Sequence, residues 1–357
     1  MEAITIKLVS ENNVCFLYVP FSLNYSYKAH MAKKFIKSLC NSGICTKDEI
    51  DATIFYEYIS RRLCDNENQV KNCHVFSVKH EHPDVMPLFE NILSIDSPIR
   101  FKSEKSKVYD FKIDDIKLVY LGDSIGFFVY QLHFIANVID TTVMANSLYF
   151  LKKTTITKLL IKDKQENGFS FLDLSLEIIR KITNNQSEHF GFSCFFHIAK
   201  RNARSNYLLM ANISTSLNDS KCKKALYYLN NGFCDKYQYR ESSDNSDTIY
   251  FAPNGRCWGI SPESSVCLIR FRHEAAEKKM FSEFKKSYFL LYTFLLYQKY
   301  SYYYFLSKID ISKNMHTKEI KKYQDELIDF EIESVFSIIT EIPQYMGFYK
   351  STCRYII

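Results

Sequence analysis

Hydrophobic and polar positions along the chain alternate between the two-residue period of strands and the 3.6-residue period of helices. Strands are expected at 4–9 and 14–20 (paired around the polar stretch 10–13), 75–78, 106–111, 113–121, 126–136, 194–198 and 207–213. Helices are expected at 27–39, 48–63 (with Thr46 as N-cap), 142–154, 172–183 (started by Asp173) and 222–230. This interleaving predicts an α/β fold, with a central mixed sheet covered by helices on both faces.

A hairpin is predicted around Asn254 and Gly255. Apolar, β-rich runs flank the two residues, and both residue types tolerate a positive φ. A further strand at 266–271 and a long helix from Glu274 to about Lys308 are expected to follow. The helix segment 287–306 carries a single charge, Lys299, but its tyrosines make it less apolar than a membrane span. We therefore expect a buried helix of a soluble domain.

Two more helical patterns end the chain. The first covers 318–339, and the second starts at Pro343, a residue suited to the first turn of a helix. No Gly or Asn cap follows the second pattern, which favours a helix that continues in a longer protein. We expect one α/β domain over 1–342, with a candidate subdivision near residue 140. Long C-terminal helices then lead into a truncated stalk, and residues 343–357 are the start of this stalk-like helix.

The net charge of +6 is mild for a chain of 357 residues. A dedicated nucleic-acid binder usually has a steeper, more clustered basic excess, so we expect an anionic small ligand and no nucleic acid. The eleven cysteines are scattered without a Cys-x-x-Cys pair, and the N-terminus has no signal-peptide pattern. Both features favour reduced thiols and a cytoplasmic location.

Catalytic signatures are missing from the sequence. It contains no Gly-x-Ser-x-Gly elbow, no Gly-x-Gly-x-x-Gly and no Walker A motif. We therefore expect no enzymatic activity and no resident cofactor, although Mg²⁺ stays a candidate. His80 and His82, with Cys73 and His74 upstream, lack standard zinc spacing and are interpreted as loop residues. The alternative is an enzyme site assembled from His80, His82, His197 and Asp173.

Two polar clusters are candidates for ligand binding. The basic stretch 200–206 contains Arg204 and Asn206, which could hold a phosphate; the alternative is a solvated loop. The turn at 254–263 combines the guanidinium of Arg256 and the single indole, Trp258, with polar donors. Such a set suits an adenine nucleotide. In the alternative, Trp258 is a core residue and Arg256 pairs with Glu263. The candidate ligand residues are Arg204, Asn206, Asn254, Arg256, Trp258 and Ser261.

Three segments of the last 170 or so residues resemble the cytoplasmic domain of CorA-like divalent-cation transporters, in the branch found beside type III CRISPR systems. They are the Gly-Arg-Cys-Trp-Gly-Ile-Ser-Pro-Glu turn at 255–263, the aromatic helix 288–300, and the stalk entry Phe-Ser-Ile-Ile-Thr-Glu-Ile at 336–342. The family's Gly-Met-Asn filter motif and its two membrane helices are absent. No ligand residue can be transferred by motif.

The resemblance implies the ligand-sensing domain of an inner-membrane channel, which acts as a CRISPR-linked antiviral effector. It also implies a pentamer, joined to the membrane through a C-terminal part absent from this sequence. The implied ligand is a nucleotide second messenger, an S-adenosylmethionine–AMP conjugate, that opens the pore. The alternatives are a stand-alone defence protein that binds nucleic acid through the 200–204 patch, or the regulatory domain of a Mg²⁺ transporter.

Overall fold

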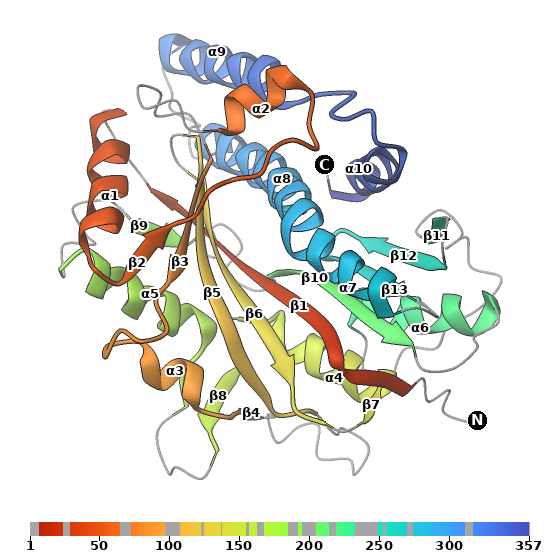
Figure 1. Ribbon diagram of the computed structural model, residues 1–357. Helices are drawn as coiled ribbons and strands as arrows, with labels where there is room; N and C mark the ends of the chain where they lie inside the picture. The colour runs from red at the N-terminus through yellow and green to blue at the C-terminus, as the bar shows by residue number, and fades with distance from the viewer. Residues whose placement is uncertain are drawn as a thin grey trace.

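The computed structural model describes residues 7–23, 29–64, 73–96, 108–122, 125–136, 138–154, 157–162, 168–184, 192–194, 205–213, 219–232, 249–252, 255–269, 274–310 and 317–356. Within these ranges thirteen strands form one sheet (Figure 1). Strands β10 and β13 pair in parallel, and the other pairs are antiparallel. A separate hydrophobic cluster lies on each face. The predicted α/β fold with a mixed, doubly covered sheet is confirmed.

The main path of the sheet runs across nine strands. In spatial order they are β11 (Ile249–Ala252), β12 (Arg256–Ser261), β13 (Ser264–Ile269), β10 (Asn206–Ile213), β1 (Lys7–Leu23), β6 (Ile125–Phe134), β5 (Phe111–Leu121), β3 (His74–Val78) and β2 (Cys45–Lys47). Four short strands pair beside this path: β4 (Leu93–Asp96), β7 (Val138–Asp140), β8 (Lys158–Ile161) and β9 (Phe192–Cys194).

Strand β1 holds the two halves of the chain together. It pairs with β6 on one side and with β10 on the other, so strands from before and after residue 140 share one sheet. Of the two strands predicted at 4–9 and 14–20, the described residues, from Lys7 on, belong to this single strand. The pairing of β1 with β10 shifts register between Leu8 and Asn13, so an irregularity in the ladder takes up the polar stretch that suggested a turn.

One face of the sheet packs against helices from the first two thirds of the chain. These helices are α1 (Ala29–Asn41), α3 (Met86–Glu90), α4 (Thr141–Leu151), α5 (Phe171–Ile182) and α6 (Asp219–Asn231). Local signals explain several of their ends. Gly43, with φ +73°, follows α1, and Ser170 and Asp173 form a capping box at the start of α5.

The other face packs mainly against the C-terminal helices. They are α7 (Glu274–Glu283), the π-helical turn η5 (Phe284–Tyr288), α8 (Phe289–Asp310) and α10 (Pro343–Ile356), joined by α2 (Glu57–Leu63). Helix α9 (Thr317–Ser334) packs on α8, where Phe330 contacts Tyr297 and Phe305. The helix predicted from Glu274 therefore exists but contains a π turn. Helix α10 belongs to this layer, because Phe348 and Tyr349 are buried against α8 and the sheet.

Two local predictions were wrong for physical reasons. The helix predicted at 48–63 covers only α2, and Thr46 lies in β2. The Asp48 amide donates to the Val75 carbonyl, and the Asp48 carboxylate binds Lys117, so this residue extends the sheet edge. The hairpin predicted around Asp114 and Asp115 is a register shift inside the continuous strand β5.

Candidate functional site

Trp258 lies in the core on β12. Its side chain is fully buried, and its ring centroid lies 4.6 Å from that of Phe348 on α10 and 5.0 Å from that of Tyr288. Phe284 stacks at 6.4 Å. The expected position on a tight turn is therefore corrected: the indole sits on a strand, under η5 and α10, and presents no open stacking surface. The burial agrees with the alternative interpretation of Trp258 as a core residue.

Arg256 lies two residues before Trp258, and its side chain points to the same face of the sheet, toward η5 and α10. Its guanidinium donates to Tyr288 Oη at 3.4 Å and to Gln344 Oε1 on α10 at 3.2 Å, and it contacts Met280 Sδ at 3.7 Å. The alternative pairing with Glu263 does not form, because Arg256 and Glu263 lie at opposite ends of the β12–β13 ladder. The Glu263 carboxylate binds Lys152 instead. Arg256 thus ties β12 to helix α10.

Two of the six predicted ligand residues, Arg204 and Asn254, lie outside the described residues, as does His197. The other four are buried. Asn206 and Ser261 lie together at the tight loop between β12 and β13. Arg256 and Trp258 lie nearer the start of β12, away from this loop. The structure thus splits the predicted set into a core pair and a pair at this loop.

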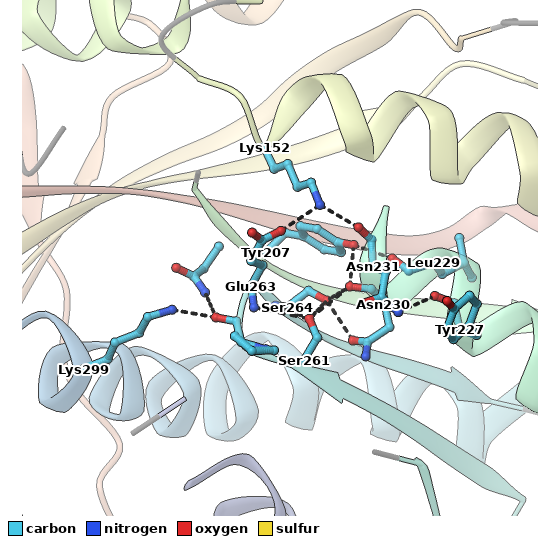
Figure 2. A network of polar contacts seen from close by, with 12 residues as sticks. Lys152, Tyr207, Tyr227, Leu229, Asn230, Asn231, Ser261, Glu263, Ser264 and Lys299 are labelled. Atoms are coloured by element: carbon cyan, nitrogen blue, oxygen red, sulfur yellow. Dashed lines mark hydrogen bonds and ion pairs between the residues drawn. The ribbon is translucent and has the colours of Figure 1, made fainter. Parts of the chain in front are cut away.

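The loop at 261–264 is the centre of a polar network, which we call the turn network (Figure 2). Asn206 Nδ2 donates to the Pro262 carbonyl at 3.1 Å, and Tyr300 Oη of α8 donates to Asn206 Oδ1 at 2.9 Å. The Tyr207 amide donates to the Glu263 carbonyl at 3.2 Å. The first residues of β10 and the middle of α8 therefore both contact the loop.

The end of α6 completes the network from the other face of the sheet. Ser261 Oγ donates to the Asn230 carbonyl at 3.1 Å, and Ser264 Oγ bonds to the Asn230 side chain at 2.8 Å. Tyr207 Oη donates to the Leu229 and Asn230 carbonyls. These bonds satisfy carbonyl groups at the C-terminus of α6, which have no partner within the helix.

Two buried lysines reach the loop from different elements. Lys152, at the C-terminal end of α4, has a side chain only 1% exposed. Its ammonium lies 2.7 Å from Glu263 Oε2 and donates to the Asn231 carbonyl at 2.5 Å. Lys299 of α8 donates to the Pro262 carbonyl at 2.6 Å. Figure 2 places the two side chains on different sides of the loop.

Burial dominates the electrostatics of Lys299. Desolvation lowers the pKa of its ammonium from 10.5 to about 8, against the opposing attraction of Glu263. Lys299 also lies 5.7 Å from the centre of the Tyr300 ring, and burial raises the pKa of that phenol. The network thus joins two buried lysine head groups and one partly exposed carboxylate, which suits an anionic partner more than a cationic one.

The histidines of the enzyme alternative lie elsewhere. His80 stacks on Phe89 at 4.0 Å, and its Nε2 is 3.8 Å from Asp115 Oδ1; His82 Nδ1 lies 3.7 Å from Asp84 Oδ2. Asp173 caps the first turn of α5, about 12 Å along that helix from Lys181, which reaches the Asp84 carbonyl. The structure thus does not join Asp173 to the histidines.

The upstream histidine of the metal candidate, His74, is buried on β3, and desolvation with nearby Lys47 lowers its pKa to about 4. In the part of the chain that the structure describes, no three His, Cys, Asp or Glu side chains gather as metal ligands would.

Sequence reasoning missed Lys152, Lys299, Tyr207 and Tyr300 as members of the network. One signal was available for Lys299, since a single charge inside the aromatic segment 287–306 must find a polar partner when the segment is buried. Lys152 had no such signal, because Glu263, its partner, is more than 100 residues away in sequence.

No described helix combines the length and the apolar composition needed to cross a membrane. Comparison of the chain with models of protein families, with curated proteins and with solved structures gave no match.

Proposed function

We propose that this chain is the ligand-sensing domain of a CorA-like membrane channel and binds a nucleotide second messenger of the S-adenosylmethionine–AMP type. The family part of the proposal comes from the resemblance of the 255–263 turn, the aromatic helix and the stalk entry. In this proposal the domain faces the cytoplasm, the channel is a pentamer in the inner membrane, and the bound messenger opens its pore.

One observation carries the sensor role. The β12–β13 hairpin contacts two separate places: the turn network at its loop, and helix α10 at its other end. Arg256 and Trp258, which hold α10, lie only five and three residues before Ser261 of the network. A ligand that changes the hairpin at its loop would act on α10, the helix identified with the start of a stalk.

The side chains of the network fit the chemistry of the messenger. Lys152 and Lys299 supply positive charge for a phosphate, and Asn206 and Ser261 supply amide and hydroxyl groups. Arg204, which precedes Ser205 and Asn206 in sequence, stays in the proposal as a phosphate contact. A charge-assisted contact of this kind contributes about 1.5–3 kcal/mol, or about ten- to a hundredfold in affinity.

Titration calorimetry tests the function. The purified chain should bind the S-adenosylmethionine–AMP conjugate more tightly than ATP or S-adenosylmethionine. Arg204→Ala should weaken binding by about tenfold or more, while Lys278→Ala, at an exposed position on α7, should leave it unchanged. If titration of the conjugate into the folded protein gave no binding heat, the sensor proposal would be refuted.

A further inference from the structure

The loop at 261–264 carries a carboxylate in a place that an anion could occupy. Glu263 is 29% exposed, whereas its partner Lys152 is 1% exposed. The carboxylate thus lies at the boundary between solvent and a buried ammonium. A carboxylate and a phosphate present similar oxygen acceptors to a lysine, so one can replace the other on the same ammonium group.

We propose that Lys152, Lys299 and the 261–264 loop form a receptor for a phosphate-type anion, in which the Glu263 carboxylate holds the place of the anion in the ligand-free chain. The inference rests on the proposed function in one respect, that the anion would be a phosphate of the messenger. Binding exchanges one ion pair on Lys152 for another, and the Glu263 side chain turns toward solvent. No bond is made or broken in this exchange.

The buried position of Lys152 determines the energy of the exchange. A buried ammonium that loses its partner is strongly destabilising, so Glu263 can leave only when another anion takes its place. Lys152 keeps its bond to the Asn231 carbonyl throughout, so its head group stays aimed at the loop.

Lys299 adds the second positive charge. Its ammonium donates to a neutral carbonyl, Pro262 O, at 2.6 Å, and is nearly buried. An anion at Glu263's position would interact with this charge as Glu263 does now. The desolvation that lowers the pKa of Lys299 agrees with this role, because a phosphate carries more negative charge than the carboxylate it replaces and would offset more of that cost.

The test uses pyrophosphate and inorganic phosphate as probes, at constant ionic strength, with the full chain and calorimetry. Glu263→Gln removes the competing charge but keeps an acceptor for Lys152, so it should bind pyrophosphate about tenfold more tightly than the wild type. Glu274→Gln changes the net charge equally at a position that is 79% exposed, and should bind as the wild type does. Lys152→Met should lose most of the binding.

A purely structural ion pair predicts the opposite pattern. Glu263→Gln would then leave the affinity for pyrophosphate unchanged, and that result would overturn the receptor proposal. The comparison of Glu263→Gln with the wild type decides the question even where Lys152→Met fails to fold. Messenger binding that is indifferent to Glu263→Gln would refute this site but keep the proposed function. Pyrophosphate binding as predicted, without messenger binding, would keep the site and refute the function.

Discussion

The lowered pKa of Lys299 makes a quantitative prediction about stability. Replacing Lys299 by Met removes a buried charge but leaves the Pro262 carbonyl with a second donor, Asn206 Nδ2. In the wild type, the folded ammonium has a pKa of about 8 and the unfolded one the ordinary value of 10.5. Below pH 8 both states bind the proton, so the folded state carries the full desolvation cost, which corresponds to about 3 kcal/mol.

The sign of the pH dependence follows from proton binding. Between pH 8 and 10.5 the unfolded chain holds a proton that the folded chain has released, so the stability of the wild type rises with pH in this window. Lys299→Met has no such group. The wild type should therefore gain about 2 kcal/mol of unfolding free energy relative to Lys299→Met between pH 7 and 9.5.

Urea unfolding followed by the fluorescence of Trp258, the single tryptophan, measures this difference at each pH. Effects of other titrating groups cancel in the comparison of the two proteins. Lys278→Met is the matched control: Lys278 is exposed and paired with Glu274, which raises its pKa, so it stays protonated over the same window. If the unfolding free energies of the wild type and Lys299→Met changed in parallel with pH, the inference that Lys299 is buried as a charged group would be refuted.

Four further substitutions test the fold by calorimetric unfolding. Gly126→Ala should destabilise the protein by about 1–3 kcal/mol, because the added Cβ would lie 2.2 Å from the Phe21 ring. Gly347→Ala, with open space around it in α10, should be neutral or stabilising by up to about 1 kcal/mol; equal effects of the two changes would contradict the packing. Ser170→Ala should cost about 1 kcal/mol through loss of the capping box, and an unchanged midpoint would argue against that cap. Trp258→Ala should cost about 3–5 kcal/mol, and a loss below about 1 kcal/mol would exclude a core position.

Local signals in the sequence predicted the fold class and many of its elements. Helices α1, α4, α5 and α6 lie within a few residues of the predicted ranges, because their apolar periodicity and end signals are short-range. The errors came where tertiary contacts override local pattern. The polar stretch 10–13 looks like a turn but lies inside β1, where the ladder with β10 shifts register between Leu8 and Asn13. Asp48 looks like a helix start but binds Lys117.

The candidate site was harder to predict than the fold. Arg256 and Trp258 have the composition of a nucleotide site, but α10 covers them, and its Gln344 lies 88 residues after Arg256 in the sequence. Asn206 and Ser261 were named for their polarity and do lie together, because β10 and β13 pair in parallel with Tyr207 opposite Ser264. Such pairing between distant strands has no signal in a single sequence.

Hydrogen exchange of the amides in α10 tests the central claim, that a ligand at the turn network is coupled to this helix through β12. If α10 opens only together with the hairpin, saturating messenger at a hundred times its dissociation constant should slow α10 exchange by up to about a hundredfold. Helix α5, which packs on the opposite face, should be unaffected. Messenger binding that protects the network and leaves α10 exchange unchanged would contradict the account.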